Sequence, residues 1–399
     1  MLKKIVTLSL MALSIHADMT SFYKKAVETL QYDKSYNLYE VSNKTSQSAV
    51  TYSKYANFSL DATFTNTHAK LLPTSAGNFN TTDISLSDSI DVFGKNNYKI
   101  ESLRLDKKAT KVQLDTKKEQ LFIALLNLVS LYNQTSQELQ LHQNFLREQE
   151  AIYKKLKLLG EHGDITKLDV LRFKNTLTTL KTKIVSQNQA LKRMKKQLSL
   201  YAPHVGIPTL DATKLLFSKE DFIAHNPQAR LNTLDAQKRV AQARGMNKSY
   251  FPTLDTGVSY QKLDDPTGYG DNYSVGVSLH MPLNSGNFKE AEALKVSALT
   301  LKAQNITYKI QRENEYIGHR DSFENASKQL AILKKALSDY EESETTIKIA
   351  YLKQYVDFNT YLQVLQEALY VKKQIVVMQT QKAKEATLIN AIASGKVYE

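Results

Sequence analysis

Histidine, serine and glycine build many catalytic and phosphate-binding sites, but here they lack the spacing that such chemistry needs. Five histidines stand alone, without metal-ligand spacing to one another: His162, His204, His225, His280 and His319. No G-x-S-x-G or phosphate-binding loop motif is present, and Gly268-x-Gly270 has the setting of a turn. The chain has no cysteine, which excludes disulfides, thiolate metal sites and a lipidated N-terminal cysteine. We therefore expect no enzyme activity, no metal site and no cofactor.

The formal net charge of +13 raises the question of nucleic-acid binding. The lysines are spread along predicted helices, mostly away from the apolar positions, as at Lys107, Lys111 and Lys118. A solvated helix face accounts for this pattern. We expect no nucleic-acid partner.

A long apolar stripe dominates the region from Gly94 to Ala202. Residues Leu114, Leu121, Leu125, Leu128, Tyr132, Leu139, Leu146, Tyr153 and Leu156 follow a heptad pattern, and Leu177–Tyr201 continues it in strict steps of three and four. This spacing predicts two antiparallel coiled-coil helices. The first would run from about 95 to 160, roughly 100 Å at 1.5 Å per residue, which is too long for an ordinary globular domain.

Four segments alternate apolar and polar residues with the period of a strand. They lie near 57–65, 83–92, 253–261 and 272–281, and Asp88 is the one charge on an apolar face. We predict loops at 66–81 and 263–271, where proline, glycine and asparagine gather. The large apolar residues on one face of these segments are Phe58, Leu60, Phe64, Ile84, Leu86, Val258, Val275, Val277 and Leu279.

The two halves of the sequence repeat the same order of predicted elements. Residues 1–17 resemble a secretory signal, with Lys3 and Lys4 before an apolar run. We predict a first repeat at 18–202, a linker or equatorial segment at 203–225, and a second repeat at 226–399. Each repeat would contain a helix, two strands and a long helical hairpin.

Four strands with one apolar face do not form a stable unit alone, because two edges stay open. Strands of about 10–12 residues can cross a bilayer at a tilt, but only in a closed barrel. Several copies of the chain could close one, and we predict that the nine large apolar residues named above would then face lipid. The competing interpretation is a β-sandwich edge packed on soluble helices.

Several motifs, in this order and duplicated, resemble the TolC family of outer-membrane efflux proteins over nearly the whole mature chain. They are Asn226-Pro227 with its alanine-rich helix, Tyr250–Leu254, Pro282–Gly286, and Gly163–Leu171 at the first hairpin end. The resemblance implies a mainly helical fold with a small β part. Long coiled-coil hairpins would form an α-barrel, and four strands per subunit would join a twelve-stranded transmembrane β-barrel in a homotrimer.

The resemblance also implies a function. The chain would be a passive exit duct in the outer membrane, with its helical barrel in the periplasm. Its partners would be a periplasmic adaptor and an inner-membrane RND or ABC transporter, in an efflux or type I secretion system. The alternative is a periplasmic adaptor-like coiled-coil protein, although adaptors carry one hairpin and this sequence predicts two.

The ends of the two hairpins are the expected adaptor-docking sites. The residues concerned are Gly163, Asp164, Ile165 and Thr166 in the first hairpin and Gln354, Tyr355, Val356 and Asp357 in the second. Gln354 stands where the family usually has glycine. Because glycine adopts positive φ at little cost and glutamine does not, the second end is expected to be shaped differently.

In the resembled family, a tyrosine, an arginine and an aspartate hold the periplasmic end closed. The matching positions are Tyr351, Val356 and Asp169, so a Tyr351–Asp169 hydrogen bond is possible but the arginine is missing. Thr360 and Gln363 stand where aspartates line the narrowest point. We expect a gate that opens more easily and is less cation-selective. The alternative is that Asp169 only complements the dipole of its own helix.

Overall fold

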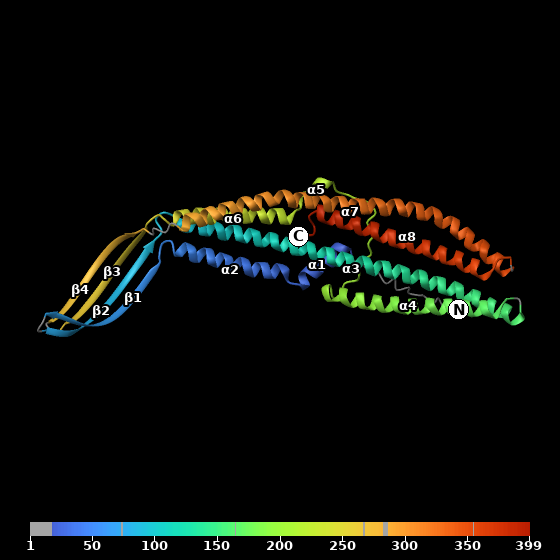
Figure 1. Cartoon of the computed structure of the whole chain (residues 1–399), viewed down its shortest axis with the longest axis horizontal. Helices are drawn as coiled ribbons and strands as arrows, with labels where there is room; N and C mark the ends of the chain where they lie inside the picture. Colours follow the sequence, from blue (N-terminus) through green and yellow to red (C-terminus); the bar gives the residue numbers. More distant parts are fainter. Residues whose placement is uncertain (1–17, 73–74, 164, 266–267, 282–285, 354) are drawn as a thin grey trace, which may run out of the picture. The chain divides into compact units, whose positions relative to one another are not determined.

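The computed structural model describes residues 18–72, 75–163, 165–265, 268–281, 286–353 and 355–399. Side chains in 67–79 and 264–269 are outside this description. The described chain is mostly α-helical, with one four-stranded sheet (Figure 1). The predicted signal segment, residues 1–17, lies outside the described residues, as do Asp164 and Gln354.

The long helices occur where the heptad spacing predicts them. The helices are α1 (Met19–Thr29), α2 (Tyr32–Tyr52), α3 (Lys95–His162), α4 (Lys167–Tyr201), α5 (Lys219–Ala224), α6 (Pro227–Lys248), α7 (Gly286–Leu352) and α8 (Phe358–Ala393). The expected mainly helical class with a small β part is confirmed. We call α3 with α4 the first hairpin and α7 with α8 the second hairpin.

The strands are β1 (Phe58–Leu72), β2 (Ser75–Ile90), β3 (Thr253–Asp265) and β4 (Gly268–His280), in the order β1-β2-β3-β4. All neighbouring pairs are antiparallel. This single described sheet differs from the two stacked sheets that a sandwich would require.

The two predicted loops, 66–81 and 263–271, are wrong over most of their length. The pairing continues through them, with Thr65 opposite Thr81 and Leu263 opposite Gly270. The Nδ2 of Asn66 donates to Oδ1 of Asn80 at 2.8 Å. These polar stretches do not alternate apolar and polar residues, but their backbones and side chains still pair across the strands. Composition alone therefore predicts strands that are too short.

Capping side chains fix where the long helices begin. The carboxylate of Asp91, which is buried, accepts from the backbone N–H of Lys95 at 3.0 Å and of Asn96 at 2.7 Å. Gly94 has φ of +72°, a conformation that glycine adopts at little cost. These interactions satisfy N–H groups that a helix leaves unpaired at its start.

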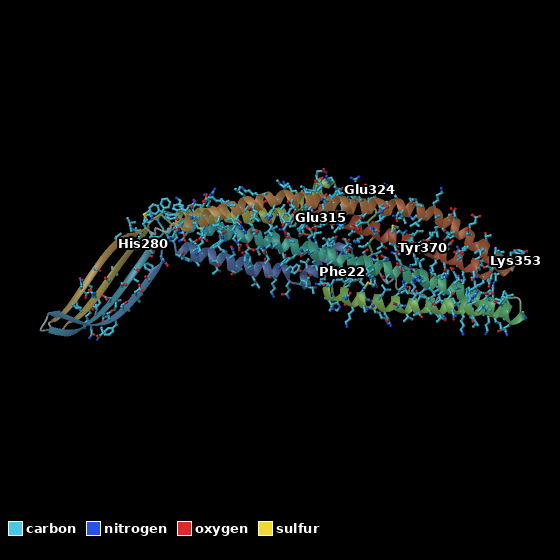
Figure 2. All side chains as sticks on the ribbon, viewed as in Figure 1. Phe22, His280, Glu315, Glu324, Lys353 and Tyr370 are labelled. Atoms are coloured by element: carbon cyan, nitrogen blue, oxygen red, sulfur yellow. The ribbon has the colours of Figure 1, made fainter. Side chains whose placement is uncertain are left out.

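The chain forms two compact units, which we describe separately. Unit 1 contains Met1–Asp33, Asp115–Asn226 and Ile310–Glu399, and unit 2 contains Lys34–Leu114 and Pro227–Lys309. The core of unit 1 packs α1 against α3 and α8, with Phe22 fully buried (labelled in Figure 2). The division into two sequence repeats at 202 and 226 stays a prediction.

The helices of unit 2 form a layer in the order α2, α3, α6, α7. Asn43 on α2 donates to the carbonyl of Leu103 on α3 at 3.0 Å, and Asp106 on α3 accepts from Lys238 on α6. Asn305 on α7 donates to Oγ1 of Thr233 on α6 at 2.9 Å. Among the described residues, these hydrogen bonds leave α2 and α7 as the two outer helices of the series.

Candidate functional site

One face of the sheet is apolar and exposed. The register aligns Leu60, Leu86, Val258 and Val275 in one row across all four strands. Directly opposed residues share a face, as do residues two apart. The residues predicted to face lipid are all exposed and all lie on this face: Phe58, Leu60, Phe64, Ile84, Leu86, Val258, Val275, Val277 and Leu279.

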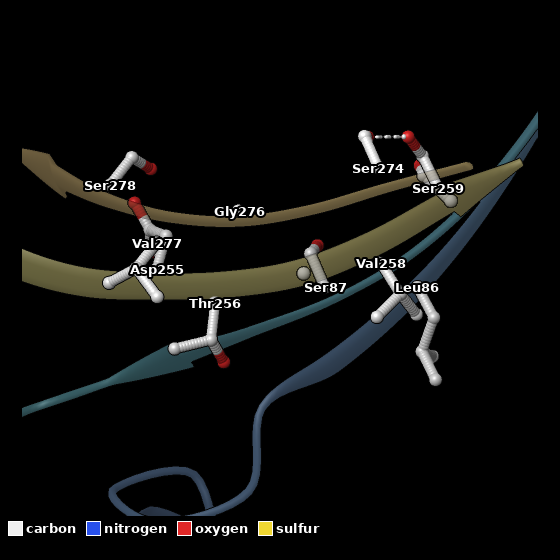
Figure 3. Close-up of a pocket in the computed structure, with 12 residues that line it drawn as sticks. Leu86, Ser87, Asp255, Thr256, Val258, Ser259, Ser274, Gly276, Val277 and Ser278 are labelled. Atoms are coloured by element: carbon white, nitrogen blue, oxygen red, sulfur yellow. Dashed lines mark hydrogen bonds between the residues drawn. The ribbon is translucent and has the colours of Figure 1, made fainter. Parts of the chain in front are cut away.

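The opposite face carries hydroxyls, glycines and carboxylates. The Oγ atoms of Ser59 and Ser87 lie 2.6 Å apart, as do those of Ser259 and Ser274. Figure 3 shows the Ser259–Ser274 pair, with Leu86 and Val258 pointing to the other side of the ribbon. These residues line a pocket of about 280 Å³. The sheet therefore separates a wettable surface from an apolar one.

Asp88, the predicted charge on the apolar face, has a local structural role. Its Oδ1 accepts from the backbone N–H of Asn57 at 2.7 Å, just before β1 begins. The carboxylate lies at the end of the strand pair, opposite Phe58. It therefore leaves the middle of the apolar face uncharged.

The two hairpin ends have similar helix caps. Gly163 has φ of +83°, and Oγ1 of Thr166 accepts from the backbone N–H of Asp169 at 3.1 Å. At the second end, Asp357 accepts from the backbone N–H of Thr360 at 2.8 Å. This hydrogen bond holds the pKa of Asp357 below its ordinary value. Tyr355 is 77% exposed.

Of the predicted gate residues, Tyr351 is buried, Thr360 and Gln363 are exposed, and Asp169 is half-buried. The hydroxyl of Tyr351 has no hydrogen-bond partner among the described residues. Burial, followed by the negative charge of Asp169, raises the pKa of Tyr351 to about 12. Asp169 is thus near enough to act on the phenol, without a hydrogen bond between them.

An aromatic cluster beside the hairpin ends is the main feature that the sequence did not reveal. Tyr153, Phe173, Phe358, Tyr351 and Tyr361 are linked by successive ring contacts, and we call them the ring chain. They come from all four hairpin helices. The heptad pattern marks Tyr153 as a core position, but no local signal shows that the rings meet across hairpins.

His142 on α3 is a second group that the sequence did not mark. It is completely buried, and its Nδ1 lies 2.8 Å from Oε1 of Gln187 on α4. Its Nε2 has no partner among the described residues. Burial lowers the pKa of His142, and nearby Lys183 and Lys373 lower it further, while the bond to Gln187 and the charge of Glu138 oppose this.

We expect acid to destabilise unit 1 through His142. The folded state prefers the neutral ring, so its stabilisation is present above the unfolded pKa of about 6.5 and is lost as the pH falls. Replacing His142 with glutamine, which stays neutral, should flatten the fall in unfolding free energy between about pH 7 and about pH 5. Denaturant titrations at each pH measure this.

The matched control is His162→Gln, because His162 is exposed at the end of α3. It should keep the acid sensitivity of the unmodified chain. Equal acid sensitivity in His142→Gln would contradict the role of His142.

Among the residues that the structure describes, no helix is both long and apolar enough to cross a membrane. The described part of the chain also contains no group of three or more histidine, cysteine, aspartate or glutamate side chains suited to hold a metal ion.

No protein-family model matches the chain, and no curated protein matches it either. Solved structures match over nearly its whole length. The outer-membrane channel OprN has a TM-score of 0.77 at 12% identity, covering 94% of this chain and 89% of that chain. The outer membrane protein VceC from Vibrio cholerae has a TM-score of 0.73 at 12% identity, covering 94% and 96%.

The Campylobacter jejuni CmeC outer membrane channel gives a TM-score of 0.69 at 12% identity, covering 96% of this chain and 86% of that chain. The chain is therefore similar in fold to outer-membrane channels. The fold expected from the motif resemblance is confirmed.

Proposed function

We propose that this chain is an outer-membrane exit duct, which passively conducts substrates from an inner-membrane pump and a periplasmic adaptor to the exterior. The observation that carries the proposal is the apolar, exposed face of a sheet whose edge strands, β1 and β4, have no strand on their outer sides in the described chain. Such a sheet is stable where the apolar face meets lipid and the edges pair with further strands.

Neighbouring copies of the same chain are the simplest source of those strands. The helical layer of unit 2 offers complementary edges, because α2 exposes Leu38 and Val41 while α7 exposes Val296, Leu299 and Ile306. When each copy joins the next through two different edges, the copies form a closed ring if the rotation from one copy to the next permits it. By the family resemblance, we propose three copies, with twelve strands around a wet lumen.

In this assembly, the polar face of the sheet lines the lumen, and the helical hairpins form the periplasmic barrel. The hairpin ends would dock the adaptor, whose pump is of the RND or ABC class. Asp169, Tyr351, Thr360 and Gln363 would lie at the gate. The fold similarity to OprN, VceC and CmeC supports this arrangement. The adaptor-like alternative has less support, because the chain has two long hairpins and a four-stranded sheet.

Conductance in planar lipid bilayers tests the proposed function. Purified protein should insert and give discrete current steps of uniform size. Absence of steps from correctly folded protein would contradict the duct. A deletion strain exposed to a panel of drugs and metal ions would then identify the exported class through increased sensitivity.

Docking at the hairpin ends predicts a specific effect of Tyr355. This side chain is 77% exposed, so Tyr355→Asp should leave the fold and assembly intact. If the ring anchors the adaptor, its loss should weaken binding at least tenfold, since tyrosine anchors contribute about 2 kcal/mol or more. Binding to purified adaptor, measured by surface plasmon resonance, gives the comparison.

Tyr370 on α8, which is 61% exposed, provides the matched control. Tyr370→Asp should bind normally. Docking through this end is wrong if Tyr355→Asp also binds normally and a photo-crosslinker at residue 355 captures no adaptor.

A further inference from the structure

The ring chain joins the two hairpins within one copy of the chain. Tyr153 of α3 stacks on Phe173 of α4, with centroids 6.2 Å apart. The ring centroids of Phe173 and Phe358 of α8 lie 6.0 Å apart. Within the ring chain, this contact joins the first hairpin to the second. Tyr351 of α7 contacts Phe358 at 6.0 Å and stacks on Tyr361 at 4.7 Å with an interplanar angle of 5°.

These rings belong to one apolar core. Ile152, Leu156, Leu177 and Leu365 are buried in the same cluster. Burial of aromatic and aliphatic surface stabilises the contact between the hairpins. Packing alone would therefore keep the hairpins together.

Two hydroxyl groups inside this core oppose that packing. Tyr361 is completely buried and Tyr351 is 6% exposed. Neither Oη atom has a hydrogen-bond partner among the described residues. Burial of a hydroxyl without a partner costs free energy that contact with water would recover.

Ionisation does not relieve this cost. Burial raises the pKa of Tyr361, and the negative charge of Glu344 and then the neighbouring Tyr351 raise it further. Glu344 is itself paired with Lys372, at 3.2 Å. Both phenols are therefore neutral near neutral pH, and each hydroxyl keeps a hydrogen that it donates to no acceptor among the described residues.

We propose that Tyr361 and Tyr351 are positioning residues that set the balance between joined and parted hairpins. Their rings hold the hairpins together, while their unpartnered hydroxyls favour a parted state in which water reaches them. This inference rests on the proposed duct, in which parting of the hairpins widens the periplasmic passage. Tyr361 is not among the residues that the family resemblance places at the gate.

The proposal predicts an effect opposite to that of a gate closed by a Tyr351–Asp169 hydrogen bond. Phenylalanine keeps the ring and removes the hydroxyl. If the hydroxyl favours parting, Tyr361→Phe and Tyr351→Phe should each strengthen the joined state. If a hydrogen bond from Tyr351 closes the gate, Tyr351→Phe should weaken it.

The separation between the hairpins can be measured directly, because the chain has no cysteine of its own. Lys174→Cys on α4 and Gln366→Cys on α8 place two exposed labelling sites on opposite hairpins. Double electron–electron resonance between spin labels at these sites gives the joined and parted populations. Dilution of labelled chains with unlabelled ones isolates the distance within one copy.

Phe173→Leu should populate the parted state by removing the ring contact between the hairpins. In this background, Tyr361→Phe should raise the ratio of joined to parted chains roughly tenfold, the size expected from one buried hydroxyl. Tyr351→Phe should act in the same direction. Tyr370→Phe, which removes an exposed hydroxyl, should change nothing.

A ratio that is unchanged or lowered by Tyr361→Phe overturns the inference, as does a Phe173→Leu variant that stays fully joined. Planar-bilayer conductance of the same variants separates this result from the proposed function. Distances that shift as expected without any conductance would contradict the duct alone. Conductance without the expected shift in distances would contradict the role of the two hydroxyls alone.

Discussion

Replacing Val275 with arginine is expected to remove the assembled protein from the membrane. Val275 lies in the row of Leu60, Leu86 and Val258 and is 83% exposed in the single chain. If this face meets lipid, arginine near the bilayer midplane costs roughly 2–4 kcal/mol in each copy. The yield of assembled protein in the outer membrane, measured by blotting after fractionation, should fall at least tenfold.

Gly276→Arg is the matched control, one residue along β4 and on the polar face. A Cβ atom added to Gly276 meets nothing within 4 Å, and the residues aligned with it are small, so an arginine has room. It should assemble nearly normally. Similar yields for the two variants would contradict the assignment of the faces, whereas loss of Gly276→Arg alone would reverse it.

Replacing Arg312 with methionine is expected to destabilise unit 1 severely. Arg312 on α7 is buried, and its Nη1 donates to Oε1 of Glu119 on α3 at 2.6 Å. Its Nη2 donates to the carbonyl of His225 at 2.7 Å, and the guanidinium lies 4.4 Å from the ring centroid of Phe222. Removing one partner from a buried ion pair typically costs about 3–5 kcal/mol, because the other charge stays buried.

Denaturant unfolding followed by far-ultraviolet circular dichroism measures this loss. Adding Glu119→Gln to Arg312→Met should recover much of the stability, because it removes the uncompensated carboxylate. Arg320→Met is the control, since its partner Glu324 lies one turn away in an exposed pair on the same helix. Equal unfolding free energies for Arg312→Met and Arg320→Met would contradict the structural role of the buried pair.

The sequence predicts the helices well because their pattern is local and long. The heptad seam that includes Leu114, Leu121 and Leu125 repeats over many turns, so the helix predicted from about 95 to 160 agrees closely with α3, Lys95–His162. The alternating strands were also found, but not their full length. Beyond Thr65 and Leu263, pairing depends on backbone contacts with the partner strand rather than on apolar alternation.

The sequence predicts features of the candidate site only where they depend on residues within a single helix or strand. The caps by Thr166 and Asp357 follow from their positions before helices. Arg312 and Glu119 are separated by 193 residues, and no local sequence pattern predicts that they pair. The ring chain could not be predicted for the same reason, because Phe173 and Phe358 come into contact only when the two hairpins pack together.

In the proposed duct, copies of this chain close a pore in the outer membrane. The decisive measurement is separation of inner membrane, outer membrane and soluble periplasm, followed by gel electrophoresis with and without heating. The duct predicts recovery in the outer membrane as a trimer that resists detergent and becomes a monomer when heated. Recovery of the folded protein as a monomer in the soluble periplasm would contradict it.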